Sequence, residues 1–240
     1  MKNVEILGVR VDNFSKEEAI EKIKYFLKEE KFHQIATINP EFILKAQEDE
    51  GFKNILNVCD LNVADGIGIR FAFLRFGKIL KSRMAGADLM EEILKLAEHN
   101  SHKVFLLAEK NGLSSWEETR MAILRKYPKI EITGIDLDKN TLPADYGLPI
   151  ASYEIILCSF GAPHQEKFLH SLKSEKDSKI RLVMGVGGSF DFLTGKRRRA
   201  PRIMQKIGLE WLWRFAQEPV YRAKRIWKAV IIFPIKIIIN

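Results

Sequence analysis

The sequence predicts an α/β protein with a Rossmann-like, mostly parallel sheet that carries helices on both faces. Short apolar runs that resemble buried strands alternate with stretches of helical periodicity. Several of these runs stop at polar or glycine-rich residues, as strands of open α/β sheets do before the next helix. In addition, 46% of the 240 residues are hydrophobic, which is enough for one sizeable core.

Seven apolar runs predict the strands, because each is rich in β-branched and other large apolar residues and ends at a turn signal. In chain order they cover residues 4–11, 32–38, 61–64, 103–108, 130–135, 153–160 and 180–186. Parallel strands that are buried on both faces have this kind of continuous apolar sequence. We therefore expect most of them in one sheet.

The stretches between these runs predict helices with recognisable starts. Two starts match capping boxes, Ser15 with Glu18 and Ser114 with Glu117, and two place a proline in the first turn, Asn39-Pro40 and Ala162-Pro163. A further helix is expected from about residue 87 to 99. Residues 136–150 are rich in proline and glycine and predict an irregular stretch.

The C-terminal part of the chain differs from the rest in charge. Residues 196–240 hold twelve Lys or Arg and two Asp or Glu, a net charge of +10 in a chain whose total is +8. We therefore divide the chain into an α/β core over residues 1–195 and a basic, amphipathic helical appendage over residues 196–240. Pro219 is expected to kink or restart the appendage helix. The excess of positive charge favours a phosphate-bearing partner, such as a nucleic acid, an anionic membrane or a phosphorylated substrate.

The composition argues against an integral membrane protein. Charged residues make up 29% of the chain, and the mean hydropathy is −0.13. The apolar C-terminal end is interrupted by Pro234 and Lys236 and is far shorter than the roughly 20 residues of a spanning helix, so we expect it to lie on a surface. No charged and apolar leader opens the sequence, which predicts a cytosolic protein with Cys59 and Cys158 reduced and buried.

Polar residues follow two of the predicted strands at the point where each ends. Thr37 lies at the end of one strand and Asn39 follows it, and Asp65 follows the next strand, on a turn that Gly66 makes tight. Ligands of open α/β sheets bind at this edge, so these residues predict a pocket for a polar substrate with Asp65 as a candidate base. Alternatively, they only cap the helices that follow, which is the commoner role of such residues.

A glycine-rich turn follows the last predicted strand, at residues 185–191. Its glycines allow backbone N–H groups to approach a phosphate, although a turn chosen for packing is an alternative. The dinucleotide fingerprint is absent because Phe190 stands in place of its third glycine, and no P-loop lysine follows. Asp136 and Asp138 form a D-x-D pair, but such pairs are common by chance, and no metal site is expected.

Taken together, six blocks of this sequence resemble the WecB/TagA/CpsF family of bacterial glycosyltransferases. The blocks are Thr37-Ile-Asn-Pro with Val63-Ala-Asp-Gly66, Arg83-x-x-Gly86-x-Asp88-Leu89, Phe160-Gly-Ala-Pro-His-Gln-Glu-Lys167, Gly185-Val-Gly-Gly-Ser-Phe-Asp191, Arg199-Ala-Pro201, and Gly208-Leu-Glu-Trp-Leu-Trp-Arg214 with Glu218-Pro219 and Arg222-x-x-Arg225. The resemblance spans residues 3–228. Three departures are His164 in place of a lysine, Trp213 in place of a tyrosine, and Glu109 at an expected glycine turn.

The resemblance implies transfer of a sugar from a UDP-sugar donor to a membrane-bound, polyprenyl-diphosphate-linked saccharide. In the TagA branch the donor is UDP-N-acetylmannosamine (UDP-ManNAc), the acceptor carries GlcNAc, and the product begins wall teichoic acid synthesis. Other branches use other donors for other surface polysaccharides. The family is thought to invert the anomeric centre and to need no metal or other cofactor.

The same resemblance suggests a role for each candidate residue. Asp65 is expected to take the acceptor proton, and Thr37, Asn39 and Gln165 to contact the sugar. The arginines at positions 83, 214, 222 and 225 belong to the predicted catalytic set, and the last three are expected to neutralise the departing UDP. The expected donor-binding residues are Gly161, Gly187, Gly188, Ser189 and Asp191, with Asp191 near the ribose.

We expect the appendage to dock on the inner face of the cell membrane, where Trp211, Trp213, Trp227 and Phe233 could enter the interface. The oligomeric state is left open, because the apolar helix face could instead cover a second subunit. Two rival functions are a nucleic-acid-binding protein that uses the basic appendage and a nucleotide-sugar-binding protein without catalysis. The nucleic-acid-binding rival gives no reason for Thr37, Asn39 and Asp65 to converge, and the nucleotide-sugar-binding rival would be indifferent to Asp65→Asn. An enzyme with no nucleic-acid partner is preferred, mainly because of the family resemblance.

Overall fold

The computed structural model describes residues 3–140, 149–175 and 178–239. It is built on an eight-stranded sheet with the order β1-β2-β4-β3-β8-β7-β5-β6. The strands are β1 (Asn3–Ile6), β2 (Val9–Asp12), β3 (His33–Ile38), β4 (Leu61–Ala64), β5 (Val104–Glu109), β6 (Ile132–Leu137), β7 (Ile155–Cys158) and β8 (Leu182–Gly185). Only the β1–β2 pair is antiparallel, so the predicted α/β class with a mostly parallel sheet is confirmed.

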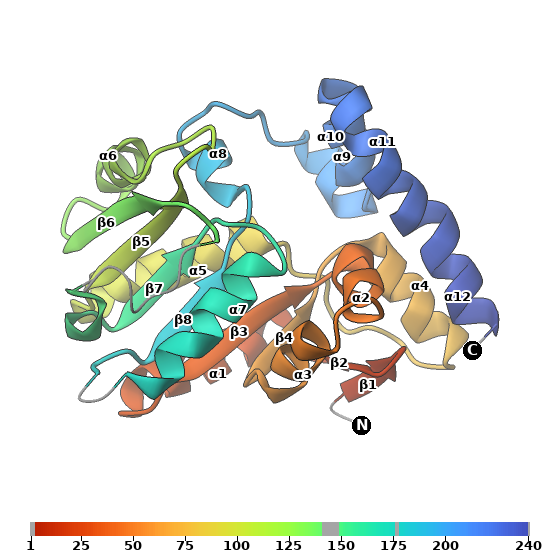
Figure 1. The fold of residues 1–240 in the computed structure, drawn as a ribbon, viewed down its shortest axis with the longest axis horizontal. Helices are drawn as coiled ribbons and strands as arrows, with labels where there is room; N and C mark the ends of the chain where they lie inside the picture. The colour runs from red at the N-terminus through yellow and green to blue at the C-terminus, as the bar shows by residue number, and fades with distance from the viewer. Residues whose placement is uncertain (1–2, 141–148, 176–177, 240) are drawn as a thin grey trace.

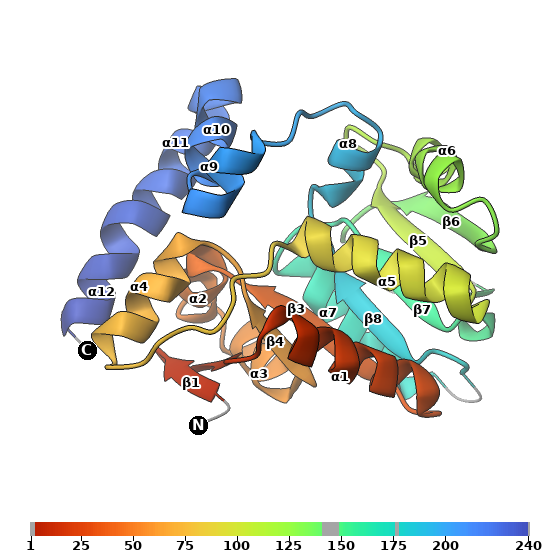
Figure 2. The same ribbon diagram turned by 180° about the vertical axis from the view of Figure 1, so that it is seen from behind.

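Helices cover both faces of the sheet. The helices of the core are α1 (Lys16–Lys28), α2 (Pro40–Ala46), α3 (Glu50–Val58), α4 (Ile67–Arg75), α5 (Gly86–Asn100), α6 (Trp116–Lys126), α7 (His164–Ser171) and α8 (Ser189–Leu193). Figure 1 shows α3 and α7 in front of the sheet, and the reverse view in Figure 2 shows α1 and α5 in front of it. The large core under α1 and α5 includes Ile23, Ile93 and Leu106, which are fully buried.

Two differences between the expected and the observed elements follow from local backbone geometry. The run over residues 4–11 forms a hairpin of two strands, because Leu7 and Gly8 adopt positive φ angles of 49° and 76° and reverse the chain. The capping box expected at Ser114 lies one residue later, where Ser115 accepts from the Glu118 N–H and Glu118 accepts from the Ser115 N–H. Most of the expected irregular stretch, residues 141–148, lies outside the described residues.

The strand order brings distant parts of the sequence to one edge. β3 lies between β4 and β8, and β8 pairs in turn with β7. All four strands are parallel, so the residues that follow them lie side by side at the carboxyl edge of the sheet. The segment after β3 begins its helix in the way expected, since Asn39 caps α2 through its side chain and Pro40 occupies the first turn.

The appendage folds back over this edge as a series of helices. They are α9 (Arg202–Ile207), α10 (Glu210–Gln217), α11 (Pro219–Trp227), a π-helical turn (Lys228–Ile232) and α12 (Phe233–Ile239). The chain breaks at Glu218 and restarts at Pro219, as predicted from the proline. Figure 1 shows this blue stretch running past α2 and along α4.

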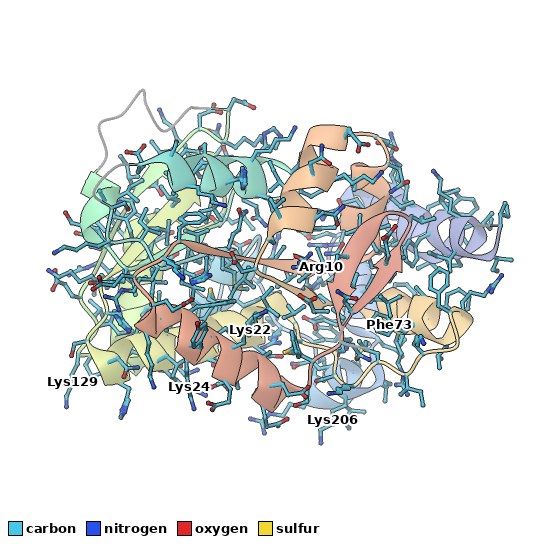
Figure 3. All side chains as sticks on the ribbon, turned by 90° about the horizontal axis from the view of Figure 1, so that it is seen from below. Arg10, Lys22, Lys24, Phe73, Lys129 and Lys206 are labelled. Atoms are coloured by element: carbon cyan, nitrogen blue, oxygen red, sulfur yellow. The ribbon has the colours of Figure 1, made fainter. Side chains whose placement is uncertain are left out.

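The end of the appendage packs on its own chain. Phe233 and Ile237 are fully buried in the same apolar cluster as Phe73 of α4, which is labelled in Figure 3. The expectation that Phe233 enters a membrane interface is therefore wrong for this conformation, because its ring is used to join α12 to α4. Trp227 is 59% exposed, whereas Trp211 and Trp213 are partly buried.

Candidate active site

A cavity of about 690 Å³ opens at the carboxyl edge of the sheet, under the appendage. It is bordered by the segments that follow β3, β4, β7 and β8 and by residues of α10 and α11. Its walls include every predicted site residue except Arg83: Thr37, Asn39, Asp65, Gly161, Gln165, Gly187, Gly188, Ser189, Asp191, Arg214, Arg222 and Arg225. Residues from the two ends of the chain therefore meet in one space.

A second cavity, of about 370 Å³, adjoins the first. Arg83 lines it, together with residues of α2, α4 and α11. The two cavities share six lining residues, which are Asn39, Glu41, Asp65, Arg214, Arg222 and Arg225. The lining of the smaller cavity also includes apolar side chains, among them Phe71 of α4 and Ile226 and Val230 of the appendage. The site thus consists of a polar chamber and a partly apolar chamber with Asp65 at their junction.

Asp65 is a carboxyl group with an unusual environment. Burial by the surrounding protein atoms is the largest effect and raises its pKa to about 6, while the charges of Arg214 and Arg83 act in the opposite direction. Glu210 raises the pKa further, and a hydrogen bond from the Gly86 backbone N–H lowers it. A carboxylate with a pKa near 6 is ionised at neutral pH and still basic enough to accept a proton.

Thr37 and Asn39 lie at the end of β3 and just after it, and β3 pairs with the strand that precedes Asp65. Asn39 caps α2, since its Oδ1 accepts from the Phe42 N–H at 3.1 Å, and it also lines both cavities. Thr37 is 8% exposed at the end of β3, and its Oγ1 lies 3.4 Å from the place where a Cβ on Gly86 would stand. Asn39 therefore combines capping with a place in the pocket wall. The capping alternative is wrong for Asp65, because the N-cap of α4 is Gly66 and no side chain caps that helix.

The three appendage arginines each contact a carboxylate in this structure. Arg214 Nη2 lies 2.9 Å from Glu210 Oε1, Arg222 Nε lies 2.8 Å from Glu218 Oε2, and Arg225 Nη2 lies 2.7 Å from Glu41 Oε2. Arg214 also stacks over the Phe192 ring at 5.0 Å. The guanidinium groups are thus held at the cavity wall by neighbours, and anionic oxygens of a ligand would share or replace these contacts.

Arg83 has a different position from the other arginines. It lines the smaller cavity and donates through Nη2 to the backbone oxygen of Gln205 in α9. This bond joins the core to the beginning of the appendage. Arg83 also lowers the pKa of Asp65, so it lies close enough to influence the candidate base.

The glycine turn after β8 has fewer backbone N–H groups available to a phosphate than the sequence suggested. The Gly187 N–H donates to Gln165 Oε1 at 3.1 Å, and the Ser189 N–H donates to the Val186 oxygen at 3.1 Å. These two amides are engaged by the protein in this structure. Gly188 lies between them at the start of α8 and lines the cavity.

Asp191 is also engaged. Its Oδ1 accepts from the Ser114 hydroxyl at 2.9 Å, and its Oδ2 lies 3.3 Å from Arg197 Nη1. Arg197 in turn contacts Glu218 Oε1 at 2.6 Å, so a chain of charges runs from the core to the appendage. The structure places Asp191 at the cavity wall and gives it a part in holding the appendage in place.

The carboxylate partners of the arginines were not found from the sequence. For Glu210 with Arg214 and Glu218 with Arg222, the four-residue spacing on a predicted helix was an available signal. No local pattern connects Glu41 to Arg225, because 184 residues separate them.

The acidic D-x-D pair has local structural roles. Asp136 Oδ1 accepts from the Trp116 N–H at 2.8 Å and so supports the start of α6, and Asp138 Oδ1 accepts from the Asn140 N–H at 2.8 Å. Within residues 3–140, 149–175 and 178–239, no group of three or more His, Cys, Asp or Glu side chains lies together as a metal-binding cluster.

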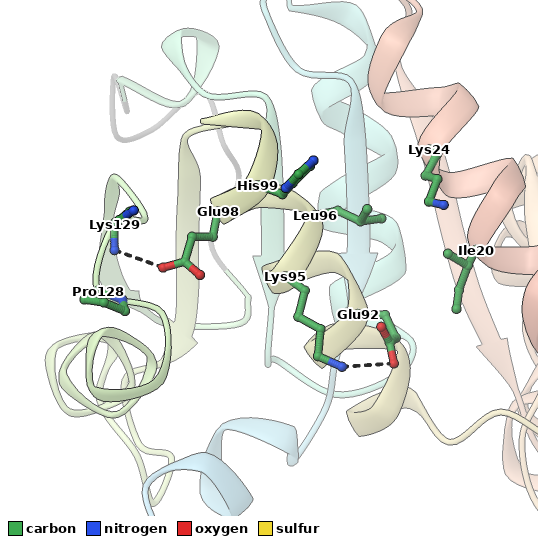
Figure 4. Close-up of a pocket in the computed structure, with 9 residues that line it drawn as sticks. All are labelled: Ile20, Lys24, Glu92, Lys95, Leu96, Glu98, His99, Pro128 and Lys129. Carbon is green, nitrogen blue, oxygen red and sulfur yellow. Dashed lines mark hydrogen bonds and ion pairs between the residues drawn. The ribbon is translucent and has the colours of Figure 1, made fainter.

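A separate groove of about 790 Å³ lies on the surface beside α1 and α5 and is shown in Figure 4. Its charged residues pair with neighbouring groups: Lys95 contacts Glu92 at 3.2 Å, and Glu98 accepts from the Lys129 backbone at 3.1 Å. It contains no predicted site residue, and its exposed, mutually paired charges are typical of a solvated surface.

None of the helices that the structure describes is both long and apolar enough to cross a membrane.

Comparison with known proteins gives a consistent result. The family model described as "Glycosyl transferase WecG/TagA/CpsF family" matches residues 4–240. A relative from Staphylococcus aureus strain MRSA252, named N-acetylglucosaminyldiphosphoundecaprenol N-acetyl-beta-D-mannosaminyltransferase, is 34% identical over 233 residues, which are 95% of this chain and 86% of the relative. A relative of the same name from strain MW2 is 33% identical over the same shares of both chains.

Proposed function

The chain belongs to the WecG/TagA/CpsF family of glycosyl transferases, and we propose that it transfers N-acetylmannosamine from UDP-ManNAc to polyprenyl-diphosphate-linked GlcNAc. The observation that carries this proposal is the position of Asp65, which lies where the two cavities join. A base at such a junction can reach an acceptor hydroxyl on one side and a donor sugar on the other. The names of the relatives specify the same sugar and the same type of acceptor.

The larger chamber suits the donor. It is polar, it includes the glycine turns after β7 and β8, and three arginines face it from the appendage. A nucleoside diphosphate sugar carries two negative charges on its diphosphate and polar groups at both ends, which matches such walls. A different UDP-sugar would fit the same general chemistry, so the choice of sugar is the finer part of the proposal.

The smaller chamber suits the lipid-linked acceptor. Its polar lining residues include Asn39, Asp65 and Arg83, which can contact a saccharide and a phosphate. Its apolar lining residues include Phe71, Ile226 and Val230. An acceptor that carries a sugar, a diphosphate and a polyprenyl chain has both polar and apolar parts to match such a lining.

In the proposed reaction, the acceptor hydroxyl oxygen attacks the anomeric carbon from the face opposite the diphosphate. The bond from that carbon to the UDP oxygen breaks, UDP leaves with the electron pair, and the hydroxyl proton passes to Asp65. The anomeric centre is therefore inverted. Arg214, Arg222 and Arg225 stabilise the charge that develops on UDP, which gives the chain its own means of doing so without a metal ion.

The surface around the smaller chamber supports docking on a membrane. Large apolar side chains that are at least a third exposed gather on α4 and on the end of the appendage, namely Phe71, Leu74, Trp227, Val230, Ile231, Ile235, Ile238 and Ile239. The appendage also carries a net charge of +10, which attracts the anionic inner leaflet by about 1 kcal/mol for each nearby Lys or Arg. We infer that the acceptor enters from this side while the protein is bound to the inner face of the cell membrane.

The test is a UDP-release assay with a short-chain lipid-diphosphate-GlcNAc acceptor, a panel of UDP-sugars, and parallel reactions with EDTA. We expect turnover with UDP-ManNAc, no loss with EDTA, and loss of about 10²- to 10⁴-fold in Asp65→Asn, the usual contribution of a general base. Activity that is indifferent to Asp65→Asn would contradict the mechanism. Salt-sensitive binding of DNA or RNA without UDP release would favour the nucleic-acid-binding alternative.

A further inference from the structure

Gln165 and Glu166 form a buried, hydrogen-bonded pair behind the larger cavity. Gln165 Nε2 donates to Glu166 Oε1 at 2.5 Å, and the two residues are 2% and 1% exposed. Gln165 Oε1 accepts two backbone N–H groups, from Gly161 and from Gly187, each at 3.1 Å. One side-chain amide therefore joins the turn that follows β7 to the turn that follows β8.

Both glycines are at the cavity wall and have conformations that other residues rarely adopt. Gly161 has a φ angle of +75° and Gly187 one of +49°. No protein atom lies within 4 Å of the place where a Cβ would stand on either glycine, so the space beside each glycine is empty. A ligand can approach the backbone closely at these two points, and their separation sets the shape of the wall.

Glu166 determines which way the amide of Gln165 faces. An ionised carboxylate only accepts hydrogen bonds, so the amide nitrogen of Gln165 must point toward it. The amide oxygen is then left facing the two glycine N–H donors. If the amide were reversed, its N–H₂ group would face the N–H groups of the two glycines, and its oxygen would face the carboxylate oxygen of Glu166. Neither arrangement allows a hydrogen bond, so both contacts would be lost.

The neighbouring residues leave the pair little freedom. The backbone oxygen of Glu166 accepts from Gln34 Nε2 of β3 at 3.1 Å. A Cβ on Gly185 would lie 2.3 Å from Gln165 Nε2 and 2.6 Å from Glu166 Oε1, so the glycine at the end of β8 makes room for both side chains. The pair is held from the β3 side and from the β8 side.

We propose that Glu166 is a positioning residue for the donor: acting through Gln165, it holds the two glycine turns at the separation that the nucleotide-sugar requires. Glu166 does not line either cavity, whereas Gln165, Gly161 and Gly187 line the larger one. Gln165 accordingly acts on the shape of the site, through contacts in addition to any that it makes with the sugar. The inference rests on the proposed function, because it assigns the larger cavity to the donor.

Glu166 can accept the hydrogen bond from Gln165 in either protonation state, because a proton on Oε2 leaves Oε1 as an acceptor. Burial is the largest effect and raises its pKa to about 7, while the hydrogen bond from Gln165 and the charge of Lys45 in α2 lower it. Glu166 also interacts with the thiols of Cys59 and Cys158, whose pKa values burial raises above the usual range. Both thiols are therefore neutral at cellular pH.

The experiment compares Glu166→Ala, Glu166→Gln and Gln165→Glu in the full-length protein, by titration with UDP and by steady-state kinetics with UDP-ManNAc. Glu166→Ala removes the acceptor, so we expect the UDP Kd and the donor KM to rise about tenfold with a smaller change in kcat. Glu166→Gln keeps an acceptor oxygen at the same place and should restore donor affinity to near the wild-type value. A purely structural role would instead reduce the fraction of active protein, lowering apparent kcat with KM unchanged.

Gln165→Glu gives an independent test that keeps the shape of the side chain. It places a second carboxyl group beside Glu166, and the pair should share one proton at low pH and repel at high pH. We expect its donor KM to rise more steeply above pH 7 than that of the wild type. Donor affinity within twofold of the wild type in folded Glu166→Ala, or no rescue by Glu166→Gln, overturns the positioning role alone. A wild-type protein that binds no UDP overturns the donor assignment and this inference together.

Discussion

Arg225 Nη2 lies 2.7 Å from Glu41 Oε2, and Arg225 Nε lies 3.0 Å from the same oxygen. This contact joins α11 of the appendage to the first turn of α2 in the core, two residues after Asn39. Both residues also line the two cavities. The guanidinium group that is expected to meet the donor diphosphate is thus already held over the site by a carboxylate, and the ligand has to share or replace that partner.

Removing Arg225 should slow turnover more than removing a neighbouring charge. We expect Arg225→Ala to lower kcat by about 10- to 100-fold, because a fixed positive charge near the leaving group is lost. Arg225→Lys should give a smaller loss, since a lysine keeps the charge without the planar fork. Lys224→Ala is the matched control, because Lys224 is an exposed residue of the same helix that lines neither cavity. Equal losses in Arg225→Ala and Lys224→Ala would count against a specific role.

The pH dependence of catalysis should follow Asp65. The base has to be ionised, and its pKa is raised to about 6, so kcat/KM should fall as the pH drops through 6 and level off above 7. The check is a pH–rate profile with donor below KM. A rate that stays constant from pH 7 down to pH 5 is the contrary outcome.

The raised pKa of Asp65 also predicts that the protein becomes less stable as the pH rises, whereas its activity increases. The unfolded chain releases this proton near pH 3.8 and the folded protein near pH 6, so wild-type stability decreases as pH rises from about 4 to 6. Above pH 6 the folded protein carries the full free-energy cost of burying the ionised Asp65 carboxylate. Asp65→Asn does not titrate and should be more stable than the wild type by about 3 kcal/mol at pH 7.5. Unfolding in urea at pH 7.5 and pH 4 measures the difference, which should shrink at the lower pH.

Packing of the appendage on α4 should be measurable in the protein without lipid. Phe233 is fully buried and Ile239 is 77% exposed on the same helix. We expect Phe233→Ala to reduce the free energy of unfolding by about 3 kcal/mol and Ile239→Ala to change it by less than about 0.5 kcal/mol. Thermal unfolding with no vesicles present provides the comparison. If both variants unfold like the wild type, α12 is not docked on α4 in solution.

Deleting residues 196–240 should separate the fold from the activity. The sheet and helices α1 to α8 lie before the deletion, so we expect a folded domain. It loses Arg214, Arg222 and Arg225, and it exposes the face of α4 that Phe233 and Ile237 cover, so transferase activity should be nearly absent and self-association should increase. Circular dichroism, UDP release and sedimentation would test the three parts. Full turnover by the truncated protein would contradict a catalytic role of the appendage.

Much of the fold could be predicted because its signals are local. The capping box at Ser15, the proline after Asn39 and the restart at Pro219 depend on residues within one helical turn of each other. The single strand expected over residues 4–11 was wrong because a two-residue reversal at Leu7-Gly8 leaves the apolar pattern nearly unchanged. The candidate site was predicted in part from polar strand ends and in larger part from a family resemblance.

The sequence by itself determined the parallel α/β sheet, the polar residues that end its strands, and the basic character of the last 45 residues, since these depend on composition and on spacing between near neighbours. Only the tertiary structure decided that Glu41 meets Arg225, that Gln165 spans the two glycine turns, and that Phe233 packs on α4. Such contacts depend on the order of strands in the sheet and on the path of the chain between them. Residues that are far apart in the sequence and carry common side chains leave no local pattern that selects one partner over another.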